Sequence, residues 1–362
     1  MKKQHFFVAL FFYSVAVFYL ASTTPISPHE AKLLYTSQDV VSTLMKWGQH
    51  FVPGFLGLRL FYLLFGFLTI GLFYHLGKHY FPKNDDAYLA TFIFMFLPGI
   101  LTASVLANVA IVVLPLVLLF VILYEKGHFF PLPFIMLLLF FVHESSMVFF
   151  IAVFLYGVMY QDKKLVFFSF SFLMAFIYFS KGIVIGGRPA GHFAEIFGLY
   201  ATLFSPLLFL YFVYAMYRTL LRGDKTLLWY ISFTALAFSL LLSIRQRVAI
   251  ADFAPYVMIA VVVMLDVYNH SVRVRLPQFQ KLYKRGFYVV VLFLSFTVCV
   301  IVFHQLLYNV TPNPKKHFAH RIYAPYTMAK KLKSEGKNCY EGNNGRYRYQ
   351  LKYYEILPCP NP

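Results

Sequence analysis

The stretch YVVVLFLSFTVCVIVF, residues 288–303, carries no charge over its whole length. It lacks the alternation of polar and apolar residues that a strand of a membrane barrel would show. Apolar runs of about 18 residues or more, the length that a helix needs to cross a bilayer, recur along the chain. Open sheets cannot cross because their edge groups would stay unpaired in lipid. The sequence therefore predicts an all-α fold, a polytopic bundle of transmembrane helices.

The composition of the chain supports this class. Of its 362 residues, 60% are hydrophobic and 13% are charged, whereas soluble domains carry about 25% charged residues. The mean hydropathy is +0.66. A net charge of +18 would suggest a nucleic-acid partner in a soluble protein. In a membrane protein it follows from topology and from anionic membrane lipids, so we expect membrane lipids as partners and no nucleic acid.

We predict about 11 spans. The first resembles a signal peptide, but no clean cleavage site follows it, so we expect an uncleaved span. Basic residues concentrate in alternate connections, which places the N-terminus in the cytoplasm and the C-terminus outside a bacterial inner membrane. The expected spans are 6–22, 55–77, 87–104, 106–124, 129–142, 146–160, 165–180, 205–221, 226–243, 254–268 and 286–304.

This topology divides the chain into a membrane domain, residues 1–304, and a short extracytoplasmic tail, residues 305–362. Cys339 and Cys359 lie in the tail, where an oxidising compartment would let them form a disulfide; two unpaired thiols are the alternative. Residues 29–47, in the first external loop, are predicted to form one amphipathic interfacial helix.

Glu30 is the sharpest candidate for chemistry. It lies in TTPISPHEAKLLY, residues 23–35, close to the outer end of the first span. A carboxylate there can accept a proton from a hydroxyl, and partial burial would raise its pKa. The alternative is a capping box at a helix start, with Ser27 as N-cap and Pro28 at the first position. Arg59, one turn into the second span, can pair with Glu30 or with a lipid headgroup.

The second candidate is RQRVAIADFAPYVMIAV, residues 245–261. Arg245 and Arg247 are expected at headgroup depth, where guanidinium groups suit a lipid-linked phosphate because they bind it through two hydrogen bonds. The alternative is that the two arginine side chains reach from the end of a span to the membrane interface and bind no ligand. Asp252 lies at the start of the next span.

Two further segments offer polar groups. The segment 181–198, KGIVIGGRPAGHFAEIFG, is predicted to be a flexible loop that offers Arg188, His192 and Glu195 to a polar ligand, or else an ordinary connector. The pair His143–Glu144 lies at a predicted hairpin tip and is either functional or merely solvated.

A metal site is not required by any spacing in the sequence. His29, Glu30 and Asp39 together could bind a divalent cation through oxygen ligands. No cofactor is certain, and a divalent cation stays possible.

Three stretches resemble the GT-C superfamily of glycosyltransferases, most closely the branch of protein mannosyltransferases and lipid A aminoarabinose transferases. PHEAKLLY, residues 28–35, resembles the acidic motif of the first external loop. LGLRLFYLLFGFLTIGLFYHLGKHYF, residues 56–81, with the hairpin over 85–127, resembles the arginine-containing run that follows it. Residues 245–261 resemble the late arginine region. Departures are His29 and Asn108, where aspartate is common, and Asp252 with a single Pro255 in place of a Tyr/Pro pattern.

The resemblance implies a mechanism. The donor would be a sugar on a polyprenyl phosphate, and the acceptor a glycan, a lipid or a protein. Glu30 would take the proton from the acceptor hydroxyl, which attacks the anomeric carbon with inversion on the extracytoplasmic face. Arg245 and Arg247 would stabilise the departing phosphate. Further residues could contact substrate: His29, Arg59, Arg188, His192 and Asp252.

Other functions stay open. A polysaccharide polymerase or ligase also uses lipid-linked sugars, and a larger external loop between late spans would favour it. A flippase or transporter would favour broken or charged helices at mid-membrane. A membrane scaffold without catalysis would leave Glu30 away from any cavity.

Overall fold

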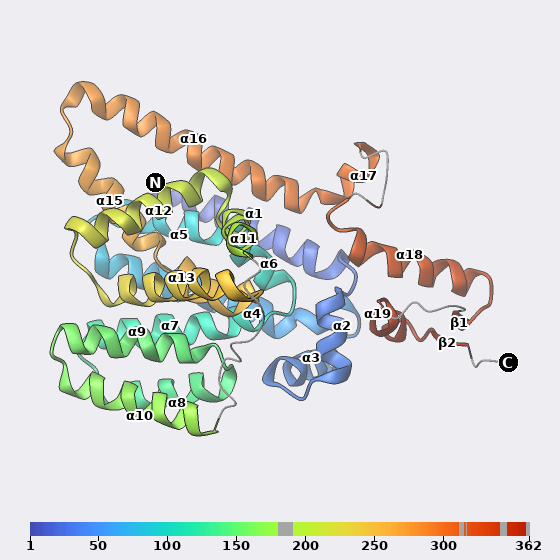
Figure 1. Ribbon diagram of the computed structural model, residues 1–362. Helices are drawn as coiled ribbons and strands as arrows, with labels where there is room; N and C mark the ends of the chain where they lie inside the picture. The colour runs from blue at the N-terminus through green and yellow to red at the C-terminus, as the bar shows by residue number, and fades with distance from the viewer. Residues whose placement is uncertain (180–190, 311–314, 316, 341–345, 360–362) are drawn as a thin grey trace. The chain divides into compact units, whose positions relative to one another are not determined.

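The computed structural model describes residues 1–179, 191–310, 315, 317–340 and 346–359. In these ranges the chain is almost entirely helical, which confirms the all-α class (Figure 1). Two strands, β1 (Cys339–Tyr340) and β2 (Leu357–Pro358), form a short parallel pair. Contacts divide the chain into two units. Unit 1 comprises Met1–Tyr13, Phe65–Ala103 and Val109–Val298, and unit 2 comprises Ser14–Leu64, Ser104–Asn108 and Cys299–Pro362.

Four of the described helices are long and apolar enough to cross a bilayer. They are α1 (Lys3–Thr23), α4 (Phe55–Tyr80), α13 (Leu227–Arg245) and α16 (Pro277–Val302). Only 17% of the apolar window of α16 is buried inside the protein, against 56% for α13. Apolar surface that no protein atom covers suits lipid, so α16 is a peripheral helix and α13 an internal one. The chain is an integral membrane protein.

Three pairs of helices meet the same criterion when each bent pair is counted as one span, which gives up to 7 spans among the described residues. The pairs are α5 (Asn84–Met95) with α6 (Pro98–Val105), bent by 60°; α11 (Phe193–Phe204) with α12 (Pro206–Arg222), bent by 107°; and α14 (Ile250–Met258) with α15 (Val261–Val274), bent by 41°. Pro98 and Pro206 open the second helix of their pairs, because proline cannot donate to the preceding turn. The expected number of about 11 spans stays a prediction.

The remaining helices of unit 1 are α7 (Val109–Glu125), α8 (Leu132–Val142), α9 (Ser146–Met159) and α10 (Lys163–Phe179). The side chains of α7 are buried on nearly every face, which is typical of a helix at the centre of a bundle. Phe120 of α7 and Phe149 of α9 are both fully buried and meet edge to face, 5.0 Å between ring centroids. The core of unit 1 therefore forms around α7 and α9, with α13 and α14 packed beside them.

Unit 2 contains α2 (Pro28–Thr36) and α3 (Val40–Phe51) from the first loop. From the tail it contains η1 (His304–Leu306), α17 (Leu307–Val310), α18 (His320–Ser334), α19 (Arg348–Tyr353) and the strand pair. The disulfide between Cys339 and Cys359 forms in the structure. A small core of four residues lies beneath it: Ala329, Tyr340, Leu351 and Ile356. Helix α19 packs on α2, and Gln350 Nε2 donates to the Ile26 carbonyl at 2.9 Å.

Two expectations about local structure are wrong. Residues 29–47 were expected to form one helix, but the chain leaves helical geometry at Ser37, whose ψ is 149°, and α3 starts only after Asp39. Short polar side chains such as these compete for backbone hydrogen bonds and favour helix ends. Of the expected loop 181–198, residues 181–190 lie outside the described residues, but from Phe193 onward the chain is helical in α11, because Ile196, Tyr200 and Phe204 follow helical spacing and are buried.

The boundary at residue 304 stays a prediction about the membrane. By contacts, the tail belongs with residues 14–64 and 104–108 in unit 2. Within unit 2, the tail therefore packs with the segment between α1 and α4, which carries Glu30.

Candidate functional site

Glu30 is fully buried and forms a two-pronged ion pair with Arg59. Arg59 Nε donates to Glu30 Oε1 and Nη2 donates to Oε2, both at 2.9 Å. The backbone N–H groups of Ala107 and Ser27 donate to the two carboxylate oxygens at 2.9 and 2.8 Å. Four donors therefore surround a carboxylate to which solvent has no access.

The capping-box interpretation of this segment is confirmed. Ser27 is the N-cap of α2, its side chain accepts from the N–H of Glu30, and the Glu30 side chain accepts from the N–H of Ser27. Pro28 occupies the first turn, where a missing N–H costs nothing. The sequence thus places Glu30 locally, and Arg59 then holds it from α4.

Arg59 also closes the end of α1. Its remaining N–H groups donate to the carbonyls of Ala21, Thr24 and Pro25 at 3.1, 2.7 and 3.0 Å. The last carbonyls of a helix have no partner within the helix. The guanidinium, whose five N–H groups are all used, therefore joins the end of α1 to the start of α2.

Two opposing effects act on the pKa of Glu30. Burial raises the pKa of the carboxyl, but the charge of Arg59 and the four hydrogen bonds together hold it below the ordinary value. A carboxylate of lowered pKa with every oxygen engaged is a weak proton acceptor, because protonation would break hydrogen bonds and leave the Arg59 charge without a counterion.

His29, the neighbouring residue on α2, has the opposite environment. Its side chain is exposed, whereas the side chains of Glu30 and Ala31 are buried. An imidazole can accept and release a proton near neutral pH. The first turn of α2 therefore presents a histidine outward and a locked carboxylate inward.

In unit 1, several sequence-predicted residues meet at one edge of the bundle, which we call the polar edge: His143, His192, Glu195, Arg247 and Asp252. Arg247 Nε donates to Glu195 Oε2 at 3.3 Å, and Arg247 Nη2 lies 3.1 Å from Glu195 Oε1. His192 Nδ1 lies 3.2 Å from Glu195 Oε2. The Arg247 side chain is 75% exposed, so its charge stays accessible.

Glu195 is shared between these two bases. The backbone N–H of Gly191 donates to the Ile244 carbonyl at 3.4 Å. That contact keeps the start of α11 beside the end of α13, and this explains why residues about fifty positions apart meet.

His143 and Asp252 form the second contact of the polar edge, at 3.8 Å, with both side chains 31% exposed. His143 is the C-cap of α8 and Asp252 lies in the first turn of α14. The hairpin tip and the late arginine region, which the sequence analysis treated separately, are therefore neighbours. Arg245, the last residue of α13, is also exposed. Arg188 lies outside the described residues.

The divalent-cation set expected from His29, Glu30 and Asp39 is not assembled in the structure. Both oxygens of Glu30 face Arg59 and backbone N–H groups, and Asp39 accepts from the Ser37 hydroxyl. Among the described residues, no group of three His, Cys, Asp or Glu side chains is arranged to hold a metal.

Sequence reasoning missed the part that residue 107 plays. Its contribution is a backbone N–H, which any residue except proline supplies, so no local signal marks it. The neighbouring Asn108 was noted only as a departure from the GT-C pattern, at a position where aspartate is common.

Comparisons with known proteins agree with this architecture. No family model matches the chain, and no curated protein sequence gives a significant match. Two solved structures are similar over nearly the whole chain. ArnT from Cupriavidus metallidurans bound to undecaprenyl phosphate gives a TM-score of 0.57 at 11% identity, covering 98% of this chain and 75% of that chain. The apo state of the same protein gives 0.55 at 12% identity, covering 96% and 73%.

At this level of identity the likeness concerns the fold. The chain has an ArnT-like GT-C fold, and the resemblance inferred from its sequence is confirmed at the level of the fold.

Proposed function

We propose that this chain is a membrane glycosyltransferase that moves a sugar from a polyprenyl-phosphate donor to an acceptor hydroxyl on the extracytoplasmic face. The observation that carries the proposal is the GT-C-like fold, shared over 98% of the chain with an ArnT whose crystal structure contains undecaprenyl phosphate. The exposed basic groups of the polar edge support it, since they offer a place for a lipid-linked phosphate.

The phosphate ligands in this proposal are Arg245 and Arg247. Arg247 already contacts both oxygens of a carboxylate, one through a hydrogen bond and one at ion-pair distance, and a phosphate presents oxygens with similar spacing. An exposed ion pair contributes only about 0–1 kcal/mol, so a phosphate can displace Glu195 at little cost. His192 and Asp252 flank the site and would orient the sugar.

For Glu30 we propose a positioning role in place of the proton-accepting role that the resemblance implied. The carboxylate is buried and holds four donors. Together with Arg59 it fixes the start of α2, where the exposed His29 lies. We propose His29 as the proton acceptor in this loop.

The reaction would then run as a single displacement. The acceptor oxygen attacks the anomeric carbon as its proton passes to a general base. The bond between that carbon and the phosphate oxygen breaks on the opposite face of the sugar, which inverts the configuration. Arg245 and Arg247 stabilise the polyprenyl phosphate that leaves with both electrons of the broken bond.

The reaction is tested with the full-length protein in proteoliposomes. The donors are undecaprenyl phosphates that carry radiolabelled hexoses or pentoses, and the acceptors come from a bacterial membrane extract. We expect label to move from the lipid to an acceptor with inverted configuration. If every donor of the panel keeps its label, the glycosyltransferase proposal is wrong.

The phosphate site is tested by titrating undecaprenyl phosphate into the protein in detergent. Arg247→Ala should weaken binding about tenfold, the cost of a lost charge-assisted hydrogen bond. Arg285→Ala, which removes another exposed arginine, serves as the matched control and should bind like the wild type. Equal affinity of all three proteins would contradict the phosphate assignment.

The proton acceptor is tested by His29→Gln, with His50→Gln, an exposed histidine on α3, as control. Loss of general-base catalysis typically costs about 10²–10⁴-fold in rate. We expect that loss in His29→Gln with unchanged thermal unfolding, and normal rates in His50→Gln. A fully active His29→Gln protein would show that His29 is not the proton acceptor.

A further inference from the structure

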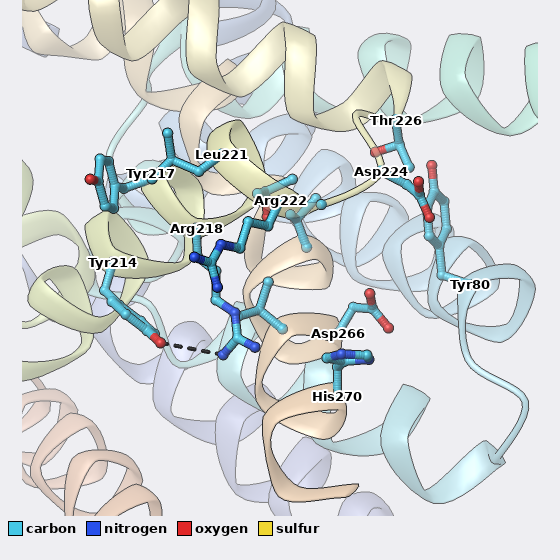
Figure 2. A pocket seen from close by; sticks show the side chains of 14 residues that line it. Tyr80, Tyr214, Tyr217, Arg218, Leu221, Arg222, Asp224, Thr226, Asp266 and His270 are labelled. Atoms are coloured by element: carbon cyan, nitrogen blue, oxygen red, sulfur yellow. Dashed lines mark hydrogen bonds between the residues drawn. The ribbon is translucent and has the colours of Figure 1, made fainter. Parts of the chain in front are cut away.

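A cavity of about 790 Å³ lies where α12 ends and α13 begins (Figure 2). Its walls come from the end of α4, the last turns of α12, the α12–α13 turn and α15. Five of its lining residues can carry charge: Arg218, Arg222, Asp224, Asp266 and His270. The volume lies in the range typical of small-molecule sites, about 300–1,000 Å³. Nothing in the proposed transfer reaction uses this cavity.

The charges in the cavity are sorted by sign. Arg218 and Arg222 are one helical turn apart on α12, and Figure 2 shows both side chains extending into the cavity. Arg218 is oriented by the hydroxyl of Tyr214 at 3.3 Å and by the hydroxyl of Ser271. The cavity therefore receives two guanidinium groups from one helix, and guanidinium groups suit a phosphate.

Asp224 and Asp266 form the opposite end of this charge pattern. Asp266 shares α15 with His270 and Arg273, whose charges attract its carboxylate more strongly than Asp224 repels it. Among the described residues, neither cavity arginine lies within ion-pair distance of either carboxylate. Two cations and two anions that do not neutralise each other favour a ligand carrying both signs.

The outer side of α12 indicates what kind of molecule carries that ligand. Five exposed apolar or aromatic residues follow one another at spacings of three and four: Leu207, Leu210, Tyr214, Tyr217 and Leu221, between 39% and 60% exposed. Residues at these spacings form one stripe along a helix. Tyr214, Tyr217 and Leu221 also line the cavity, so the stripe leads directly into it. A hydrocarbon chain would cover this stripe.

We propose that the cavity binds a phospholipid whose headgroup contains a phosphate and a primary ammonium, with its acyl chain along the α12 stripe. Arg218 and Arg222 bind the phosphate, and Asp224 and Asp266 bind the ammonium beside the tyrosine rings. Thr226 in the cavity is the N-cap of α13 and Arg245 is its last residue. A 19-residue helix is roughly 28 Å long, so the lipid site lies at the opposite membrane face from the polar edge.

The proposal is tested on the full-length protein in detergent with three probes: short-chain phosphatidylethanolamine, short-chain phosphatidylglycerol and free phosphoethanolamine. The first carries phosphate, ammonium and acyl chains; the second lacks the ammonium, and the third lacks the chains. We expect phosphatidylethanolamine to bind at least about tenfold more tightly than either of the others.

Two variants separate the roles of the charges. Arg222→Ala should weaken both phospholipids about tenfold, whereas Asp266→Asn should weaken phosphatidylethanolamine alone. Both residues are exposed, so the fold should persist, which elution as a single species checks. Arg285→Ala, which removes an exposed arginine of α16 that does not line the cavity, is the matched control and should bind like the wild type.

Three results would overturn the proposal. Equal binding of the two phospholipids by the wild type would show that the protein does not recognise the ammonium group. An equal loss of affinity for both phospholipids in Asp266→Asn would show that Asp266 does not bind the ammonium. Free phosphoethanolamine binding as tightly as the lipid would show that a soluble phosphoamine, and not a membrane lipid, occupies the site.

Discussion

At position 30 a carboxylate lies in the interior of a membrane protein with a guanidinium as its counterion. Neither charge is exposed. Removing one member of such a pair leaves the other buried without compensation, which costs much more than the pair itself contributes. The Glu30–Arg59 ion pair therefore fixes α2 against α4 within unit 2.

The pair predicts an unequal response to substitution. Glu30→Gln should lower the free energy of unfolding by about 3–5 kcal/mol, because Arg59 keeps its charge without a counterion. Arg59→Met should lower it at least as much, since three backbone carbonyls also lose their donors. Thermal unfolding in detergent measures both. Arg247→Ala, at an exposed pair, is the control and should change stability by less than about 1 kcal/mol. Equal losses in all three variants would contradict the structural role of the buried Glu30–Arg59 pair.

The same pair predicts a dependence on pH. Because the pKa of Glu30 is lowered from its ordinary value of 4.5 in the folded protein, the unfolded state takes up the proton first as the pH falls. The stabilisation is complete above that ordinary value and is lost as the pH falls through the lower folded pKa. Unfolding midpoints of the wild type and Glu30→Gln should therefore converge as the pH falls below the ordinary value of 4.5. A constant difference would contradict the assignment.

At the scale of elements, two close approaches shape the first loop. Helix α3 and the start of α4 meet through Gly48 and Gly57: a Cβ on Gly48 would overlap the carbonyl oxygen of Gly57, and a Cβ on Gly57 would overlap that of Val52. The absence of side chains at these two positions lets the backbones touch. The turn between α3 and α4 is therefore tight enough to place Arg59, two residues after Gly57, under α2.

Alanine substitutions test this contact. Gly57→Ala should destabilise the protein by about 1–3 kcal/mol, because backbone atoms must move to admit the methyl group. Gly71→Ala, in the same helix but with open space around it, should leave stability unchanged or raise it by up to about 1 kcal/mol. Thermal unfolding distinguishes the two. A harmless Gly57→Ala would show that the helices do not pack so closely.

The disulfide between Cys339 and Cys359 also stabilises the elements of unit 2. Cys339 and Cys359 are 20 residues apart, and closing a loop of that size contributes about 3 kcal/mol in the chain-entropy model. Cys359→Ser should therefore speed proteolysis of the tail and increase amide exchange in α19. The α2 segment should follow, because Gln350 no longer holds Ile26. Cys299→Ser, which removes the unpaired cysteine, is the control; equal protease resistance in both variants would contradict the prediction.

At the scale of the whole molecule, the chain combines long, straight helices with bent pairs. The bends coincide with prolines at Pro98 and Pro206, and the second also with Ser205 at a φ of 77°. Helices α11 and α12, which enclose an angle of 107°, therefore turn sharply between the polar edge and the lipid-facing stripe. The polar edge, which includes Glu195 of α11, and the cavity lined by α12 are therefore connected through the bend between these two helices.

The expected orientation leads to a prediction for the whole chain. The N-terminus should be cytoplasmic and the C-terminus extracytoplasmic, because basic residues concentrate in alternate connections. Alkaline phosphatase needs disulfides and folds only in an oxidising compartment. A fusion at the C-terminus should therefore be active, and a fusion after Lys126 should be inactive. The reverse pattern of activities would overturn the topology and the extracytoplasmic site with it.

The class of fold and much of the local structure follow from the sequence alone. Uncharged runs require helices in lipid, because no other open structure satisfies the backbone there. Ser27, Pro28 and Glu30 specify a helix start through contacts between near neighbours, so the capping box was predictable. The long helices α1, α4 and α13 were found for the same reason: their signal is contained within one segment.

Only the tertiary structure decided what each polar group does. Glu30 has the same local sequence whether it faces solvent or Arg59, and the choice depends on packing between residues 29 and 77 positions apart. The pairing of Arg247 with Glu195, 52 positions away, and the charge-sorted cavity beside α12 arise in the same way. A sequence states which groups can interact, whereas the packing of helices determines which of them meet and which remain accessible.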